Sequence, residues 1–277
     1  MEETTTPYEF KGEWDSFNAN HPLFTEKLPT LKQVLRKVFV RTFGEVDPTN
    51  AVIFTLGSQC LDEFMEILLL CASGLGFGGL KLLRGLYERA VTTQYLATFP
   101  QDINRFLDYN DIHLGKFFNH ADREYDVSTI LSEENVEAIK AAYTEAKKRF
   151  QITDCRKCGT TRLASSWSEL DVLSMAKKAQ GSGNLGFYDL YGSCYILPTM
   201  QLHTTAFSFS GLVEENDLDF SFKSDAYRDA AQRALIGAHN IIILVLKIQS
   251  NFFKLDLDSE IDALGKDFLE IWQGRQA

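Results

Sequence analysis

Helix breakers are scarce in this chain of 277 residues, which holds 6 prolines, whereas phenylalanine occurs 21 times. Few breakers and many large apolar side chains favour long, well-packed helices. Internal repeats and low-complexity stretches are missing as well. The composition, 45% hydrophobic and 24% charged, is that of an ordinary globular protein and excludes collagen, coiled-coil rods and wholesale disorder.

The sequence also lacks an apolar run of about 18 residues, the shortest helix that spans a bilayer. The nearest approach, Ile241 to Leu246, is stopped by Lys247. At the N-terminus, Glu2 and Glu3 stand where a signal peptide needs positive charge. We therefore expect a cytoplasmic protein with no membrane contact.

Positive charge is in deficit, with a formal net charge of −10 and a pI of about 5.1. Such a chain has no general attraction for nucleic acid or for anionic membranes. The five cysteines are odd in number, and Cys60, Cys71 and Cys194 lie in apolar or aromatic surroundings. This usage predicts reduced thiols, and a chain of this length needs no disulfides to bury a core.

Apolar residues recur at helical spacing through most of the chain. Pro29-Thr30 is expected to start one helix, which Gly44 ends. Asp47-Pro48 is an N-cap followed by proline at the first helical position, and it predicts a helix to about Ser73. Further helices are expected over about 80–98, 102–121, 133–150, 167–181 (after a capping box of Ser166 and Glu169), 185–210 (kinked at Pro198), 224–254 and 258–272.

The predicted fold class is therefore all-α, a single irregular helical bundle of about eight to ten helices over residues 1–277. Residues 1–28 are expected to form an N-terminal arm. The 151–165 loop is the one candidate for a subdomain hinge. Residues 211–223 are expected to be an acidic loop or a short extended piece. Large apolar helices such as 234–246 favour a homodimer.

Two short motifs match the sequence patterns of known ligand sites, but each lacks the neighbouring elements that such a site requires. The run GLGFGG at 74–79 fits the G-x-G-x-x-G pattern of dinucleotide sites. The segment before it, from Pro48, is too long for the strand that pattern requires, so we interpret the run as a closely packed helix–helix corner. Cys155 and Cys158 supply half of a tetrahedral zinc site. No second pair follows at the usual spacing, so we predict no metal site and a loop with two thiols.

One basic cluster contrasts with the acidic chain, and it consists of Lys147, Lys148, Arg149, Arg156, Lys157 and Arg162. It predicts a local contact with RNA or an acidic partner. The alternative is a solvated helix end, where cations favourably meet the C-terminal dipole.

Arg233 and His239 have the Arg-x5-His spacing of the helical ribonucleases of the HEPN superfamily. His239 lies in an apolar run, however, and short motifs often arise by chance. We interpret it as a core histidine.

The helix over 80–98 carries Arg84 and Glu88 on one stripe, at the edge of its expected buried face. Because buried charges need partners, the two side chains are expected to pair at i,i+4. Asp62, Glu63, Glu66 and Asp108 are further candidate partners. The cluster is either a structural polar network or the wall of a pocket.

Four segments of the chain form a recognisable pattern when taken together. They are LLRGLYERAVTTQYL (82–96), RFLDYNDIHLGK (105–116), SSWS (165–168) and YDLYGSCY (188–195), the last followed by His203. Together they resemble an uncharacterised bacterial helical family known as domain of unknown function 5677. The resemblance covers about residues 50–210 and implies an all-α fold, without established functional residues. It carries over Arg84, Glu88, Asp108, Tyr109, Trp167, Tyr188, Tyr191 and His203.

If those positions converge, Arg84, Glu88, Asp108 and His203 are the candidate catalytic residues. The candidate ligand-binding residues are Tyr109, Trp167, Tyr188 and Tyr191. Histidine can serve as acid or base near neutral pH, and arginine can hold a phosphate in its fork. The set predicts a nuclease-like or anionic-ligand-binding effector of the toxin or phage-defence type. The alternative is a non-catalytic helical interaction or dimerisation module. No pattern identifies a cofactor.

Overall fold

The computed structural model describes residues 10–41, 47–125, 127, 130–154, 158–180, 186–203, 213–216, 219–222 and 226–272. The helices are α1 (Lys11–Asn20), α2 (Pro22–Phe39), α3 (Pro48–Ala72), α4 (Gly76–Thr98), α5 (Ile103–Glu124), α6 (Glu133–Arg149), α7 (Val172–Gln180), α8 (Phe187–Tyr191), α9 (Leu197–Leu202), α11 (Ala226–Phe253) and α12 (Asp258–Trp272). A short 3-10 turn covers Pro100–Asp102, and a π-helical segment covers Gly192–Ile196. The strands are β1 (Gln151–Thr153), β2 (Thr161–Leu163), β3 (Val213–Asn216) and β4 (Asp219–Phe222). The chain is all-α, as predicted.

Backbone contacts divide the chain into two compact units. Unit 1 comprises residues 1–98 and 172–277, and unit 2 comprises residues 99–171. The 151–165 segment, expected as a hinge, lies wholly inside unit 2.

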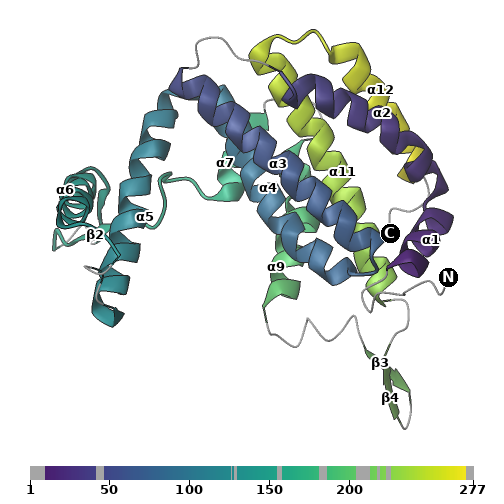
Figure 1. The fold of residues 1–277 in the computed structure, drawn as a ribbon, viewed down its shortest axis with the longest axis horizontal. Coiled ribbons are helices and arrows are strands. Elements are labelled where there is room, and N and C mark those ends of the chain that lie inside the picture. Colours follow the sequence, from purple (N-terminus) through teal and green to yellow (C-terminus); the bar gives the residue numbers. More distant parts are fainter. Residues whose placement is uncertain are drawn as a thin grey trace, which may run out of the picture. The chain divides into compact units, whose positions relative to one another are not determined.

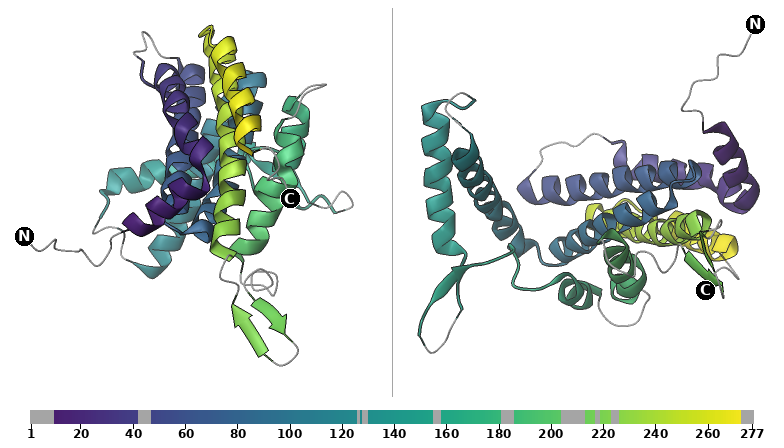
Figure 2. Two further views of the ribbon diagram at one scale, coloured as in Figure 1. Left: turned by 90° about the vertical axis from the view of Figure 1, so that its right-hand side faces the viewer. Right: turned by 90° about the horizontal axis from the view of Figure 1, so that it is seen from below.

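The three long helices α3, α4 and α11 form the centre of unit 1. Helix α11 packs against both α3 and α4, and α12 lies beside α11 and α2 (Figures 1 and 2). Phe64, Tyr87 and Leu246 are completely buried. By length and composition alone α11 could cross a membrane. In this fold its apolar residues Ile241 and Val245 are buried among the other helices.

The GLGFGG run is a helix–helix corner, as interpreted from the sequence. Gly74 adopts a left-handed φ of +76° between α3 and α4. A Cβ on Gly76 would collide with the backbone of Tyr227 and Ala231 at the start of α11. One on Gly79 would lie 2.7 Å from Cys71 Sγ. The glycines therefore let α3, α4 and α11 approach one another closely, and the space that their missing side chains leave is filled by these helices and not by a ligand.

The predicted helix starts at Asp47 and Ser132 are confirmed, whereas the one at Pro29-Thr30 is wrong. Asp47 accepts a hydrogen bond from the Asn50 amide at 3.0 Å, and Ser132 caps α6. Helix α2, however, begins at Pro22 and contains Pro29. Phe24, only 1% exposed, belongs to the apolar face of α2, and its burial outweighs the hydrogen bond that a proline removes. The described part of the expected N-terminal arm is α1 and the start of α2.

The predicted capping box before α7 does not form. The Ser168 hydroxyl accepts from the Leu170 amide instead, and α7 begins only at Val172. The irregular turn expected near Pro198 lies one turn earlier, in the π-helical segment Gly192–Ile196. A proline at 198 has no N–H for the carbonyl of Cys194, and a wider turn accommodates that loss.

Two antiparallel hairpins are present in the described part of the chain, and the first lies in a segment expected to be a loop. Strand β1 pairs with β2, with Ile152 opposite Arg162, in the region predicted to be a loop. Strand β3 pairs with β4, with Val213 opposite Phe222. Of the two alternatives for residues 211–223, the extended one is closer to the structure.

Candidate functional site

Arg84 and Glu88 form the predicted i,i+4 pair on α4. The Arg84 Nη2 atom lies 3.1 Å from Glu88 Oε1 and 3.5 Å from the Tyr195 hydroxyl. The guanidinium carbon of Arg84 also lies 5.1 Å from the centre of the Tyr195 ring. The side chains of Arg84 and Glu88 are 29% and 38% exposed, so the pair sits at the edge of the core, as expected.

A group of tyrosines supports this pair. Tyr191 and Tyr195 stack with ring centres 5.1 Å apart, and the Tyr87 ring is tilted against both. The Tyr87 hydroxyl donates to the Phe187 carbonyl at 2.7 Å, which ties α4 to α8. Tyr191 was a predicted ligand residue. Tyr87 and Tyr195 were missed, although Tyr195 follows Tyr191 at i+4 and shares its helix face.

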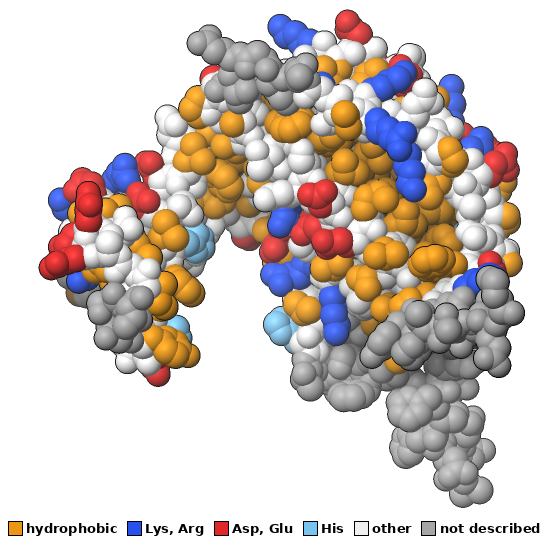
Figure 3. Space-filling view, viewed as in Figure 1, with side chains coloured by type: hydrophobic (Ala, Val, Ile, Leu, Met, Phe, Trp, Pro, Cys, Tyr) orange, Lys and Arg blue, Asp and Glu red, His pale blue; other side chains and the backbone are white. Residues whose placement is uncertain are grey.

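Acidic groups crowd the neighbouring face of α4. Arg89 Nη1 lies 2.8 Å from Glu63 Oε1, and burial raises the pKa of the Glu63 carboxyl, with Glu66 and Glu88 adding to the rise. Figure 3 shows acidic and basic side chains gathered over α3 and α4. Because these three carboxylates interact with one another, this face of α4 is a poor place for a further anion.

The remaining predicted residues of unit 1, Tyr188 and His203, are both exposed. Tyr188 is 44% exposed, and its neighbour Asp189 caps α8 by accepting from the Gly186 amide at 2.9 Å. His203 is exposed just beyond α9. It follows Tyr195 by eight residues, which is roughly 12 Å along a helix axis.

The predicted residues of unit 2 stabilise that unit. Asp108 pairs with Arg149 at 3.0 Å. Tyr109 is buried, and its hydroxyl donates to the Ala164 carbonyl at 2.8 Å. The Trp167 carbonyl accepts from Arg105 Nε at 2.7 Å. Tyr109 and Trp167 thus belong to the small core between α5, α6 and the β1–β2 hairpin.

The basic cluster is partly neutralised inside unit 2. Lys148 pairs with Glu145 at 2.7 Å, and Arg162 pairs with Asp154 at 2.8 Å. Lys147 Nζ lies over the Tyr143 ring, 5.2 Å from its centre. Arg156 and Lys157 lie outside the described residues. A cavity of about 510 Å³ adjoins the cluster, lined by Asn119, Lys140, Tyr143, Thr144, Lys147, Lys148 and Gln151.

His239 is a core histidine, as interpreted from the sequence. It is 3% exposed, and its Nδ1 accepts from the Trp272 indole at 3.1 Å. Burial lowers the pKa of His239 to about 4, so the ring is neutral at pH 7. Arg233 is exposed at the surface.

The three buried cysteines of the described part of the chain are poor nucleophiles at neutral pH, because their thiols stay protonated. Burial raises the pKa values of Cys60 and Cys71 to about 12, and that of Cys194 to about 11. Cys155 lies outside the described residues, and Cys158 contacts the Thr160 hydroxyl at 3.0 Å. Among the described residues, no three His, Cys, Asp or Glu side chains are grouped to hold a metal ion.

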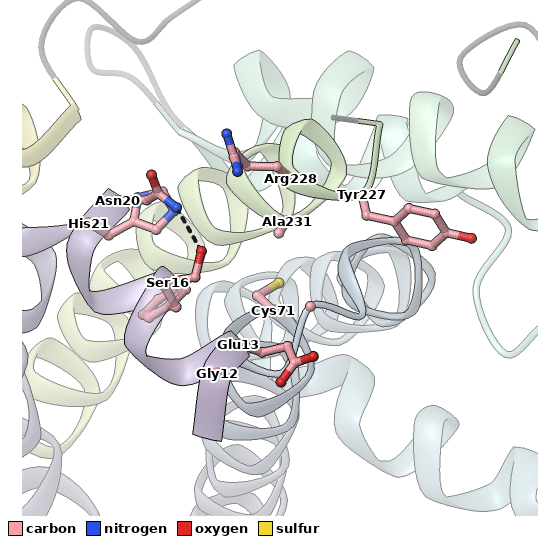
Figure 4. A pocket seen from close by; sticks show the side chains of 11 residues that line it. Gly12, Glu13, Ser16, Asn20, His21, Cys71, Tyr227, Arg228 and Ala231 are labelled. Atoms are coloured by element: carbon pink, nitrogen blue, oxygen red, sulfur yellow. Dashed lines mark hydrogen bonds between the residues drawn. The ribbon is translucent and has the colours of Figure 1, made fainter. Parts of the chain in front are cut away.

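A second cavity, of about 360 Å³, was not anticipated from the sequence. It lies in unit 1 between α1, the end of α3 and the first turns of α11 (Figure 4). Its lining consists of Gly12, Glu13, Ser16, Phe17, Asn20, His21, Cys71, Gly74, Tyr227, Arg228 and Ala231. A usable signal was the helical spacing of Glu13, Phe17 and Asn20 in the arm.

These observations define an all-α helical protein. The chain belongs to the family of unknown function DUF5677, which matches it over residues 50–221. This segment runs from α3 into β4, so α1, α2, α11 and α12 lie outside it. No curated protein and no solved structure matches the chain.

Proposed function

We propose that this protein binds a phosphate-bearing ligand at the lysine-lined cavity of unit 2. The observation that carries the proposal is the position of three lysines, Lys140, Lys147 and Lys148, around one cavity of about 510 Å³. The cavity lies within the segment that matches the family. Its volume is in the range of small-molecule sites.

The lysines are brought together by the periodicity of α6. Lys140, Thr144, Lys147 and Lys148 follow at i, i+4, i+7 and i+8, so they share one face of the helix. The side chains of Lys140 and Lys148 are 50% and 67% exposed, and they pair with the exposed carboxylates of Glu137 at 3.5 Å and Glu145 at 2.7 Å. Lysine binds phosphate as a mobile point charge. Several such charges around a cavity therefore favour a phosphate group over a neutral ligand.

The polar side chains at the edges of the cavity extend this chemistry. Asn119 contributes an amide from α5, and Gln151 contributes one from β1. Lys147 Nζ lies over the Tyr143 ring, and the ring packs against Gly115, where an added Cβ would collide with it. We propose that the recognised group is the phosphate itself, because the lining holds three lysines.

The lining supports binding rather than cleavage. Phosphodiester cleavage needs a positioned general acid or base. The described side chains that line the cavity are lysine, tyrosine, threonine and amides, with no histidine or carboxylate among them. The Arg84 cluster of unit 1 is a weaker anion site, because Glu63, Glu66 and Glu88 interact on that face of α4.

The competing explanation is that the lysines serve α6 itself. Lys147 and Lys148 lie in the last turn, where cations stabilise the helix dipole by about 0.3–1 kcal/mol. That role predicts a change in melting temperature when the lysines are replaced, with no change in ligand affinity.

The test compares ligand affinity with fold stability. Fluorescence anisotropy with a labelled single-stranded RNA, and calorimetry with inorganic tripolyphosphate, give dissociation constants for the wild type and for Lys140→Gln/Lys147→Gln. We expect the double variant to bind at least about tenfold more weakly, with a shallower salt dependence. Lys32→Gln, an exposed lysine on α2, is the matched control.

The two probes distinguish the source of the phosphate. RNA binding without tripolyphosphate binding indicates a polynucleotide, and the reverse indicates a small ligand. Failure of the wild type to bind either probe would refute the proposal, and so would equal affinity of the double variant and the wild type.

A second candidate function, self-association, is favoured by an apolar stripe on α5. Leu107, Leu114 and Phe117 lie near one face of this helix and are 42%, 46% and 72% exposed. Exposed apolar patches mark interaction sites, and a second copy of the chain is the occupant we propose. Sedimentation of the wild type over a range of concentrations should show a dimer that Phe117→Ser weakens. A wild type that stays monomeric throughout would exclude this function.

A further inference from the structure

The geometry of the α1–α3–α11 cavity points to a binding site for a small zwitterion, with a carboxylate at Arg228 and an ammonium group at Glu13. This inference does not depend on the proposed function, because every residue that lines the cavity belongs to unit 1. It assigns a ligand class to a cavity that the family match covers only at Cys71 and Gly74.

The cavity has the form of a small-molecule site, with an apolar floor and polar walls. Cys71, Ala231 and His21 are 3%, 6% and 5% exposed, so they form its closed side. In Figure 4, Cys71 and Ala231 lie at the centre, with Arg228 and Glu13 on different sides of them. Its volume of about 360 Å³ lies in the lower part of the range for ligand pockets. A ligand of amino-acid size suits this volume.

Arg228 supplies the positive side of the cavity. It is exposed and lies two residues after the first residue of α11, a helix of 28 residues. The positive end of the helix dipole therefore adds to the charge of the guanidinium. A guanidinium carries five N–H donors in a planar fork, which suits bidentate binding of a carboxylate and leaves donors for other partners.

Glu13 supplies the negative side, and the turn after α3 determines its position. The Glu13 Cγ lies 3.3 Å from where a Cβ on Gly74 would stand, so the absence of a side chain there lets Glu13 lie against the turn. The neighbouring Trp14 donates its indole N–H to Ser73 Oγ at 3.1 Å. This bond attaches α1 to the end of α3. Glu13 is therefore held at the rim of the cavity rather than on a free helix.

Neutral groups between the two charges complete the site. Asn20 Nδ2 donates to Ser16 Oγ at 3.2 Å, and both side chains line the cavity (Figure 4). Phe17 contributes an aromatic wall, with its ring centre 4.9 Å from that of His21. One cation, one anion, a hydroxyl–amide pair and an apolar floor match an amino acid. A ligand with a single charge would leave either Glu13 or Arg228 without a ligand contact.

The experiment titrates the proteinogenic L-amino acids singly into the full chain by calorimetry. The amino acid that binds best is then compared with its decarboxylated amine and its deaminated acid. We expect the zwitterion to bind at least about tenfold more tightly than either analogue, since each lost contact is a hydrogen bond to a charged group. Failure of all the amino acids to bind, or an analogue that binds as tightly as the zwitterion, would overturn the inference.

Four variants assign the two ends of the ligand. Arg228→Gln should weaken the binding of the zwitterion and of the acid about tenfold and leave the binding of the amine unchanged. Glu13→Gln should weaken the binding of the zwitterion and of the amine by a similar factor and leave the binding of the acid unchanged. Arg233→Gln on α11 and Asp15→Asn on α1 are exposed controls outside the lining, and they should retain wild-type affinity. Controls that weaken binding as much as the lining variants would refute the assignment, as would lining variants with unchanged affinity. Melting temperatures confirm that each variant is folded.

Discussion

Trp272 on α12 donates its indole N–H to Nδ1 of His239 on α11 at 3.1 Å, and both side chains are buried. The acceptor role of Nδ1 places the histidine proton on Nε2 in the neutral ring. The rings of Phe24 and Phe268 pack edge-on against the same imidazole. A neutral histidine therefore joins α2, α11 and α12, and an imidazolium there would be a buried charge.

The first prediction concerns the pH dependence of stability. Burial lowers the pKa of His239 to about 4 in the folded protein, whereas the unfolded value is about 6.5. The unfolded state therefore binds the proton more readily, and this group's contribution to stability falls as the pH drops from about 6.5 to 4. The loss amounts to roughly 3 kcal/mol.

Urea unfolding between pH 7 and pH 4 measures this effect. In His239→Asn, whose side-chain oxygen can accept the Trp272 bond but does not titrate, the decline should be smaller than in the wild type. Equal declines in both proteins would show that His239 does not titrate as the structure requires.

The second prediction separates the two contacts of Arg84. Glu88→Ala should lower the free energy of unfolding by about 0.5 kcal/mol or less, because the pair is partly exposed. Arg84→Ala should lower it by about 1 kcal/mol, since the contact with the Tyr195 ring is lost as well. A double-mutant cycle of Arg84→Ala with Tyr195→Ala measures that ring contact. A coupling energy near zero would mean that the contact contributes nothing.

The third prediction tests the helix corner with two glycines. Gly76→Ala should destabilise the protein by about 3 kcal/mol, because the new Cβ meets the backbone of Tyr227 and Ala231 and cannot be relieved by a rotamer change. Gly265→Ala in α12 meets nothing within 4 Å and should stabilise it by about 0.5–1 kcal/mol. Denaturant midpoints measure both changes. Similar effects of the two substitutions would contradict the close packing of α4 on α11.

The fourth prediction concerns the core of unit 2. Tyr109→Phe removes the hydroxyl that donates to the Ala164 carbonyl. It should lower the free energy of unfolding by about 1–2 kcal/mol, because a buried acceptor is left unpaired. Hydrogen exchange should show lower protection of the α5 and α6 amides, while those of α3 and α11 stay protected. Tyr143→Phe serves as the control, because the Tyr143 hydroxyl has no hydrogen-bond partner among the described residues.

Local sequence signals predicted the helix ends that are decided within a few residues. Asp47 and Ser132 cap their helices because a side-chain oxygen three positions before an amide needs no tertiary partner. Ser166 and Glu169 present the same pattern, yet that segment stays irregular, with the Trp167 carbonyl bonded to Arg105. Pro29 predicts a helix start for the same local reason, but the burial of Phe24 extends the helix back to Pro22.

The candidate site was predictable only where it lies on one helix. The Arg84–Glu88 pair follows from i,i+4 spacing, whereas the Tyr195 contact joins residues 111 positions apart. The pairing of Asp108 with Arg149 likewise required two helices to meet. The lysines of the basic cluster were visible in the sequence, but the cavity they share with Asn119 and Gln151 was not.

Composition and periodicity were enough to establish an all-α chain with an acidic balance and thiols in apolar surroundings, because these properties depend on residue counts and on neighbours within a turn or two. The cavity under α1 depends on where α1, the end of α3 and the start of α11 meet. So does the role of His239, which is set by a tryptophan 33 residues away. Only the folded chain brings such distant segments into contact, since their packing is decided by burial across the whole unit.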